Sequence, residues 1–205
     1  RDNRKIELTY TEFEILQLLA KFQAAFFQSV TTRTAGFASI SQSGLTNGSK
    51  LLACMLMIVG GSPAGTAGGI KTTTVAVLLL TAISVLRGNK DTECYGRKIT
   101  FEIIRVGITI TLVTFVFWLF GVTVMTVIEP QQKVLDLMFE ATSAMATVGL
   151  TADLTPVLSD ISHVVLMLMM YIGRIGPMTM ALIFSGHVDK KNQFRTLPEA
   201  KIMVG

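Results

Sequence analysis

The sequence predicts an all-α integral membrane protein, and three observations support this fold class. Half of the 205 residues are hydrophobic and 16% are charged, and the mean hydropathy is +0.55. The stretch 106–128 carries no charge and is long enough to cross about 30 Å of hydrocarbon. Two further apolar stretches, from about 50 to 86 and from about 161 to 185, are each interrupted by Gly, Pro or a cation. This composition is too apolar for an ordinary soluble domain.

Charged residues between the apolar stretches indicate sidedness. Cations gather in the segment before 106–128 (Arg87, Lys90, Arg97, Lys98, Arg105) and after the last stretch (Lys190, Lys191, Arg195, Lys201). Both segments are therefore predicted to be cytoplasmic. The segment 129–160 then faces outside, with Lys133 as its single cation among five carboxylates: Glu129, Asp136, Glu140, Asp153 and Asp160. It is either an acidic vestibule that concentrates cations or an ordinary solvated loop.

Several classes of protein do not fit the composition. The net charge of +4 comes without a basic block, which argues against a nucleic-acid partner. Cys54 and Cys94 make neither a disulfide framework nor a metal site, and His163 and His187 lack neighbours of the ligand type. The chain begins at Arg1 without a signal peptide, and we interpret it as the C-terminal part of a longer protein.

Two segments align at one constant offset. The stretch "AFFQSVTTRTAGFAS" (25–39) matches "MFEATSAMATVGLTA" (138–152), and the same offset places Gly60 over Gly173 and the Pro63 region over 176–177. Each unit is predicted to hold a short apolar helix of about ten residues, too short to cross a membrane. A Thr-x-Gly turn follows, and then a long stretch broken near its middle. A full span, 106–128, precedes the second unit only.

The Thr-x-Gly turns have a chemistry suited to cations. The C-terminal end of a short helix that stops within the membrane carries partial negative charge. The backbone that follows it must be buried in protein or line water, and its carbonyl oxygens can then replace the hydration shell of an ion. Glycine allows backbone angles that other residues avoid. The predicted ion-binding residues are Thr34, Ala35, Gly36 and Phe37 in the first turn and Thr147, Val148, Gly149 and Leu150 in the second.

The stretch "GGSPAGTAGGIKTTT" (60–74) interrupts an apolar segment and has three interpretations. It is a helix break without a function, a phosphate-binding loop, or a flexible gate in an ion pathway. The phosphate-binding pattern fails because Ile70 stands where its second glycine belongs. The gate is favoured, because non-helical backbone at membrane depth is tolerated beside a water-filled cavity. The predicted gate residues are Gly60, Gly61, Ser62, Pro63, Ala64, Gly65, Thr66, Ala67, Gly68, Gly69, Lys71 and Arg174.

Two of these gate residues are cations within apolar stretches. A charge at the centre of a membrane helix is unfavourable by roughly 2.5–3.5 kcal/mol, so Lys71 and Arg174 are expected to face a cavity or a partner. Arg174 is either a gate residue bound to loop carbonyls or a structural residue paired with a carboxylate elsewhere. Arg33 is predicted to be structural. Five methionines are predicted to serve helix packing: Met167, Met169, Met170, Met178 and Met180.

Four stretches carry a family resemblance: "SVTTRTAGF" (29–37), "GGSPAGTAGGIKTTT" (60–74), "ATSAMATVGLT" (141–151) and "YIGRIGPMT" (171–179). They resemble the membrane subunit of the Ktr/Trk/HKT potassium transporters, and KtrB-like members most closely. The resemblance implies K⁺-channel-like repeats of membrane helix, pore loop and membrane helix around a central pore. Residues 1–95 then correspond to a third repeat without its first membrane helix, and 96–205 to a fourth repeat with the C-terminal tail.

The resemblance also implies a function and partners. The transported ion would be K⁺, and Na⁺ as a coupling or activating ion is left open; no organic cofactor is expected on this chain. A homodimer in the bacterial plasma membrane would bind a cytosolic octameric KtrA-like ring, which holds ATP, ADP or NAD. The tail 201–205 either packs at the dimer interface or is a disordered end. The alternative to a K⁺ pathway is a non-conducting membrane scaffold or regulatory fragment, and neither interpretation is an enzyme.

Overall fold

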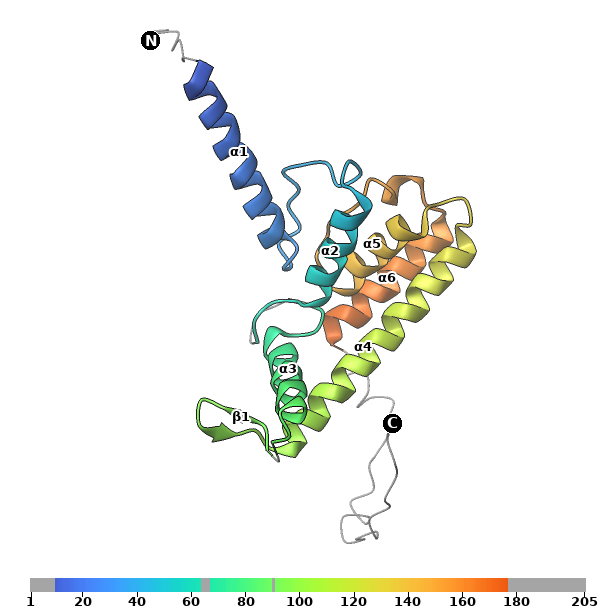
Figure 1. The fold of residues 1–205 in the computed structure, drawn as a ribbon. Helices are drawn as coiled ribbons and strands as arrows, with labels where there is room; N and C mark the ends of the chain where they lie inside the picture. Colours follow the sequence, from blue (N-terminus) through green and yellow to red (C-terminus); the bar gives the residue numbers. More distant parts are fainter. Residues whose placement is uncertain (1–9, 64–66, 90, 177–205) are drawn as a thin grey trace.

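The computed structural model describes the backbone of residues 10–63, 67–89 and 91–176, with side chains from residue 17 onward. The described chain is mostly helical, as the sequence predicts (Figure 1). The helices are α1 (Tyr10–Thr31), α2 (Asn47–Ile58), α3 (Thr72–Leu86), α4 (Phe101–Ile128), α5 (Val134–Met145), the 3₁₀ turn η1 (Thr155–Val157) and α6 (Asp160–Ile175). A short hairpin of β1 (Glu93–Cys94) and β2 (Arg97–Lys98) joins α3 to α4.

Helix α5 lies at the centre of the helical body and packs against α2, α4 and α6 (Figure 1). All its residues from Phe139 to Met145 are buried, which is the pattern of a helix surrounded by others. The indole N–H of Trp118 on α4 donates to the hydroxyl of Thr142 at 2.8 Å and fixes the two helices together. At 12 residues α5 is about 18 Å long, too short to cross a bilayer.

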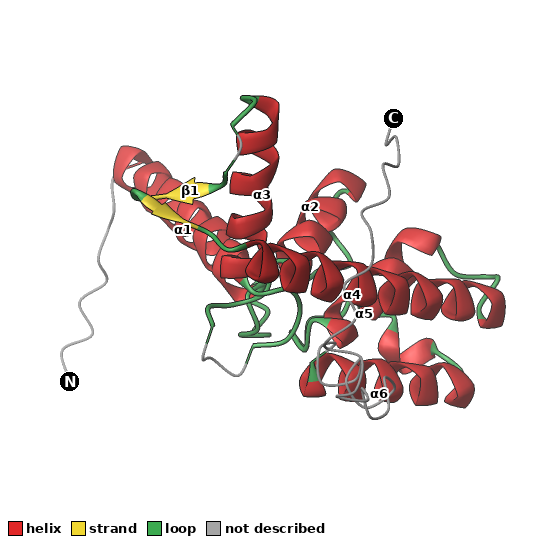
Figure 2. Cartoon of the chain, turned by 90° about the horizontal axis from the view of Figure 1, so that it is seen from below, coloured by secondary structure: helices red, strands yellow, loops and turns green. Residues whose placement is uncertain are grey.

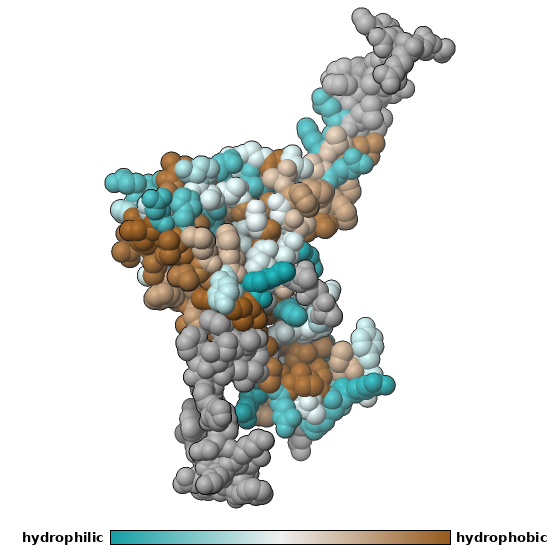
Figure 3. Space-filling view, turned by 180° about the vertical axis from the view of Figure 1, so that it is seen from behind, coloured by the Kyte–Doolittle hydropathy of each residue, from teal (hydrophilic) through white to brown (hydrophobic). Residues whose placement is uncertain are grey.

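Helix α4 has the length and composition of a membrane span. It contains 28 residues with a mean hydropathy of 2.2 in its most apolar window, and within the described ranges no other helix meets both conditions. Seen from behind, hydrophilic residues lie along the upper edge and at the lower end of the molecule, with hydrophobic residues between them (Figure 3). This distribution suits a protein whose middle lies in hydrocarbon.

The predicted short helix before the first turn is longer in the structure. The sequence predicts about ten residues there, whereas α1 has 22 and extends away from the other helices (Figure 1). Its apolar side chains Leu18, Phe22 and Phe26 are exposed. The helix continues because Glu, Leu, Gln, Ala and Lys favour helix and no Gly or Pro interrupts the segment. Polarity alone does not end a helix, and the prediction of its length was wrong for this reason.

The hairpin was also not predicted, since residues 87–98 read only as a polar connection. Its turn places Tyr95 and Gly96 at φ of 50° and 73°, which is the geometry of a tight turn between antiparallel strands. Tyr95 is a rare residue at positive φ, so the usual Asn-Gly or Asp-Gly signal is absent.

The break in the last apolar stretch falls at Gly176, one of the two places that the alignment marks, and not at Gly173. Gly173 lies inside α6, and the helix ends at Ile175, where Gly176 at φ 89° caps it. A Cβ atom at Gly173 would overlap the carbonyl oxygen of Met145 at the end of α5. Gly173 is therefore required for close approach of the two helices. Residues 177–185 of this stretch lie outside the described part of the chain.

We expect Gly173→Ala to destabilise the protein more than Gly121→Ala. Both substitutions add one methyl group at a buried glycine, but at Gly121 the methyl meets the flexible side chain of Met169. At Gly173 it meets backbone, which cannot move without shifting a helix, and overpacking of this kind costs about 1–3 kcal/mol. Apparent melting temperatures of the purified membrane protein in detergent measure the difference. Equal melting temperatures for the two variants would contradict the close contact.

Candidate functional site

The two Thr-x-Gly turns each begin at the C-terminal end of a helix and share one backbone pattern. The first turn (34–37) follows α1, and the second turn (147–150) follows α5. Thr34 and Thr147 have φ of 68° and 53°, and Gly36 and Gly149 have φ of 72° and 88°. A β-branched residue at positive φ is a true outlier, and such strain concentrates at functional sites. The same strained pattern thus occurs twice, at matching positions of the aligned segments.

Hydrogen bonds of the turns direct carbonyl groups away from the helices. The amides of Ala35 and Gly36 both donate to the carbonyl of Thr31, and the amide of Val148 donates to the carbonyl of Ser143. In a planar trans peptide the carbonyl oxygen points opposite to the amide hydrogen. The carbonyl oxygens of Thr34, Ala35 and Thr147 therefore point away from the helix ends.

The two turns meet although more than a hundred residues separate them in the chain. A Cβ atom at Gly36 would overlap the carbonyl oxygen of Val148, so the two backbones are in direct contact. The segments that follow the turns are also joined, because the hydroxyls of Ser41 and Ser43 donate to Asp153 at 3.2 and 2.6 Å. The hydroxyl of Thr34 is buried and has no hydrogen-bond partner within the described residues. It is a polar group held out of water at the start of the first turn.

The last residues of the two turns, Phe37 and Leu150, differ in their environments. The carbonyl of Phe37 accepts a hydrogen bond from the Thr31 hydroxyl at 2.6 Å, so this oxygen is engaged within its own repeat. The Phe37 side chain is exposed, whereas Leu150 is buried in a cluster with Phe139. The Phe37 carbonyl therefore differs from those of Thr34 and Ala35, which point away from the helix end. Gly149 has open space where a Cβ would lie.

The glycine-rich loop (59–71) connects α2 to α3, as the sequence predicts for an interrupted span (Figure 2). Its ends lie side by side, because two hydrogen bonds join them. The amide of Gly60 donates to the carbonyl of Ile70 at 2.9 Å, and the amide of Ile70 donates to the carbonyl of Ile58 at 3.0 Å. A Cβ at Gly60 would overlap the carbonyl oxygen of Gly68. The glycines therefore permit backbone contact that larger residues would prevent.

The glycine-rich loop touches the second turn directly. The amide of Gly68 donates to the Thr147 hydroxyl at 3.0 Å. A Cβ at Gly68 would lie 2.5 Å from that hydroxyl oxygen and 2.9 Å from the carbonyl oxygen of Ala146. Gly68 therefore joins the predicted gate to the predicted ion-binding turn through one hydrogen bond and one backbone contact.

The remaining predicted gate residues fall in three places. Ser62 and Pro63 are exposed, and Gly61 contacts Ala67 across the loop, since a Cβ at Gly61 would lie 2.8 Å from that of Ala67. Lys71 is half-buried and precedes the first residue of α3, while Arg174 is exposed in the last turn of α6. Outside the described residues lie Ala64, Gly65 and Thr66, as well as Met178, Met180, His187 and the tail 201–205.

The segment 129–160 does not form the open cluster of carboxylates that a vestibule needs. Asp136 pairs with Lys50 at 2.7 Å, and both side chains are largely buried. Glu140 is buried, and hydrogen bonding from Ser159 and Ser162 lowers the pKa of Glu129. Asp153 and Asp160 are the carboxylates of this segment that stay exposed. Sequence reasoning missed these pairings because the partners are far apart in the chain, and no local pattern marks them.

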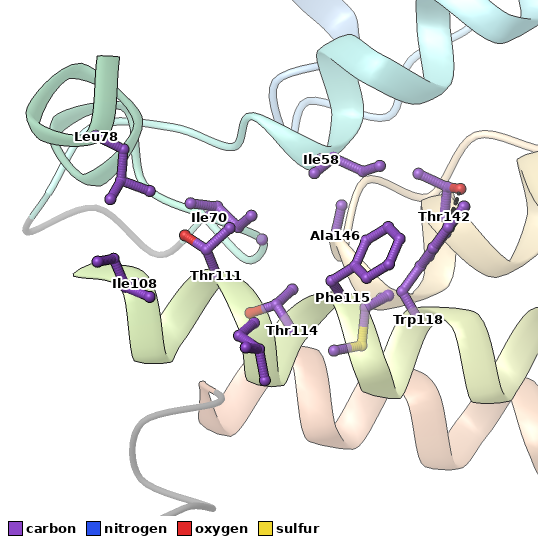
Figure 4. Close-up of a pocket in the computed structure, with 13 residues that line it drawn as sticks. Ile58, Ile70, Leu78, Ile108, Thr111, Thr114, Phe115, Trp118, Thr142 and Ala146 are labelled. Carbon is purple, nitrogen blue, oxygen red and sulfur yellow. Dashed lines mark hydrogen bonds between the residues drawn. The ribbon is translucent and has the colours of Figure 1, made fainter. Parts of the chain in front are cut away.

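An apolar cavity of about 480 Å³ lies beside α4, between the ends of α2 and α5 (Figure 4). Ile58 lines it from the end of α2, Ile70 from the glycine-rich loop, Phe115 from α4 and Ala146 from the residue that caps α5. The loop is thus not packed solidly against α4, which leaves room for displacement of Ile70 and its neighbours.

The mostly helical fold, with one helix long and apolar enough to cross a bilayer among the described residues, suits an all-α membrane protein. Residues 7–195 match the family model TrkH, described as "Cation transport protein", and the chain belongs to this family. This confirms the resemblance drawn from the four sequence stretches.

Curated relatives include potassium transport proteins. The chain is 36% identical over 190 residues to "Ktr system potassium uptake protein B" of Bacillus subtilis, with 93% of this chain and 42% of the relative covered. It is 36% identical over 183 residues to "Potassium/sodium uptake protein NtpJ" of Enterococcus hirae, with 88% and 41% covered. A protein B of the same Ktr system from Vibrio alginolyticus is 35% identical over 162 residues, with 79% and 35% covered. The chain spans less than half the length of each relative.

We expect Gly68→Ala to separate the glycine-rich loop from the second turn. The added methyl cannot fit beside Thr147 and Ala146, so the hydrogen bond from the Gly68 amide breaks. Hydrogen exchange measured by mass spectrometry should show faster exchange in peptides that cover 59–71. Gly48→Ala is the matched control, because a Cβ there has no neighbour within 4 Å. Unchanged protection in Gly68→Ala would contradict the contact.

Proposed function

We propose that the chain forms part of a K⁺ pathway in which the two turns bind the dehydrated ion through backbone oxygens. The observation that supports this most is their meeting: Gly36 lies against Val148 with the same strained backbone in both turns. The carbonyl oxygens of Thr34, Ala35 and Thr147 point away from the helix ends and would be ligands. The names of the relatives from Bacillus subtilis and Vibrio alginolyticus support potassium as the ion.

The electrostatics of the site favour a cation. The C-terminal ends of α1 and α5 carry partial negative charge, and both lead directly into the turns. The unpartnered Thr34 hydroxyl adds an oxygen that gains a partner when an ion binds. Uncharged oxygens suit the task because a fixed anion would hold the ion too tightly for transport.

Two turns surround an ion only in part. A complete ring of carbonyl ligands requires two more turns of the same kind. This agrees with the chain spanning 42% of the Bacillus subtilis relative. A non-conducting membrane scaffold is the alternative for the chain by itself, and the open space beside Gly149 favours it. The complete polypeptide, with four repeats around one axis, is the unit that we propose to conduct.

The glycine-rich loop is proposed as the gate. It lies against the second turn through Gly68, and Ile70 borders the cavity into which it can move. Lys71 and Arg174 bring positive charge to this level of the pathway, where it opposes the passage of cations. The guanidinium of Arg174 is proposed to donate hydrogen bonds to carbonyl groups of the loop and so to hold the loop in place.

The assembly proposed is a homodimer in the bacterial plasma membrane with several spans per chain. A cytosolic octameric ring that binds ATP, ADP or NAD would control the glycine-rich loop. The support is the name of the relatives, which are components of a Ktr system. Whether Na⁺ also acts as a coupling ion is a separate question, which the potassium/sodium uptake relative makes relevant.

Rubidium uptake into proteoliposomes tests the proposed function. We expect uptake with the complete polypeptide, competed by K⁺ more strongly than by Na⁺, and none with the chain alone. We expect Gly36→Ala to abolish selective uptake, because its methyl overlaps the Val148 carbonyl, and Gly149→Ala to reduce it less, because only the positive φ is strained there. An absence of cation flux through the folded complete polypeptide would support the scaffold instead.

We expect Arg174→Ala to raise K⁺ flux severalfold in the complete polypeptide when the cytosolic ring and nucleotide are absent. Removing the guanidinium takes away both a repulsive charge and the proposed contact with the loop. Arg174→Lys is the comparison, since it retains the charge but not the planar set of donors. Flux and nucleotide dependence identical to the unmodified protein would remove Arg174 from the gate.

A further inference from the structure

A buried carboxylate braces the second turn from behind. Glu140 lies in the middle of α5 and is 4% exposed, which is rare for a glutamate without a compensating partner. Its burial removes it from any vestibule, and its carboxylate faces the segment that follows Gly149. The Glu140 carboxylate therefore makes its hydrogen bonds within the protein.

Three hydrogen bonds to the carboxylate come from one short segment, 151–155. The Thr151 hydroxyl and the Ala152 amide donate to Oε1 at 2.5 and 2.9 Å, and the Thr155 hydroxyl donates to Oε2 at 2.9 Å. Hydrogen bonds to a carboxylate are about twice as strong as those between neutral groups. Glu140 thus ties the backbone immediately after the second turn to the helix immediately before it.

The second turn is consequently held at both ends. At its start, the amides of Thr147 and Val148 donate to carbonyls of α5, and at its end Glu140 holds Thr151 and Ala152. The distance between the two attachments determines how far apart the turn carbonyls stand. A change in the second attachment is therefore transmitted to the oxygens that we propose as ligands.

The first turn is braced by a different chemistry. Gln28 on α1 and the fully buried Gln42 exchange hydrogen bonds between their amide groups at 2.6 and 3.1 Å. Gln42 also donates to the carbonyl of Ile40 at 2.7 Å. A neutral pair thus joins α1 to the segment that follows the first turn, whereas Glu140 makes charge-assisted hydrogen bonds, which are the stronger kind.

We propose that Glu140 is a positioning residue for ion selectivity, because its carboxylate sets the spacing of the carbonyl oxygens in the second turn. The inference rests on the proposed function, since it assigns a role within the same ion pathway. Glu140 does not contact the ion and acts through the backbone of residues 147–152.

The test replaces Glu140 by Gln in the complete polypeptide. Glutamine has nearly the same shape, but its amide nitrogen cannot accept a hydrogen bond, so one acceptor for Thr151, Ala152 and Thr155 is lost and the remaining bonds lose the charge that strengthens them. We expect the K⁺/Na⁺ permeability ratio in proteoliposomes to fall about tenfold, since a hydrogen bond to a charged group is lost. The ratio does not depend on how much protein inserts, so a general loss of stability does not produce this change.

The matched control is Glu129→Gln. Glu129 also accepts hydrogen bonds from a backbone amide and a hydroxyl, those of Ser159 and Ser162 at 2.8 Å each, but it lies at the end of α4 and not behind a turn. Its substitution should leave the K⁺/Na⁺ ratio unchanged. A second pair of variants tests the hydroxyl that donates to Glu140. Thr155→Val removes this donor and should lower the K⁺/Na⁺ ratio, whereas Thr155→Ser keeps the donor and should retain the ratio.

The outcomes separate the two proposals. An unmodified polypeptide that conducts no K⁺ contradicts the proposed function. A selective unmodified protein with an unchanged ratio in Glu140→Gln overturns the role of Glu140 alone. A ratio that falls equally in Glu129→Gln also overturns it, because the effect is then not specific to the turn. If Glu140→Gln does not fold, the Thr155 pair decides by the same criterion.

Discussion

Peptide groups that leave a helix inside a membrane must find new partners, because hydrocarbon offers none. The two turns and the glycine-rich loop answer this constraint in the same way, through backbone contact at glycine. Gly36 lies against the Val148 carbonyl, and Gly60 lies against that of Gly68. The turn amides donate to carbonyl groups at the ends of α1 and α5, and amides of the loop donate to carbonyl groups at its opposite end. Some carbonyl oxygens of the turns point away from the helix ends, and those are the groups that we propose as ligands for a dehydrated cation.

The central helix α5 organises these contacts. It packs against three other helices, ends at the second turn and carries Glu140, which holds the chain on the far side of that turn. Its end also receives the glycine-rich loop, because Gly68 contacts Ala146 and Thr147. The second turn, the glycine-rich loop and Glu140 therefore meet within a few residues of one helix. Under the proposed function, a movement of the loop would act directly on the turn that it contacts.

The sequence predicts the structural features that depend on neighbouring residues, and it does not predict the contacts between residues that are far apart in the chain. The alignment of 25–39 with 138–152 led to both turns, and the Gly and Pro content of 60–69 led to the interrupted span, which the structure divides between α2 and α3. The length of α1 was wrong, because helix propensity continues through residues that are polar. The acidic segment was misleading as well, since Asp136 meets Lys50 across 86 positions of the chain.

What the sequence determined by itself is local: where apolar runs occur, where Gly and Pro forbid a regular helix, and where Thr-x-Gly recurs. These features act over a few residues, and backbone sterics are the reason that they can be read directly. Only the tertiary structure decided that the two turns touch, that Gly173 is a packing contact and not a break, and that Glu140 is buried behind the second turn. Such contacts depend on which helices pack together, and packing is governed by the shape of the whole folded chain.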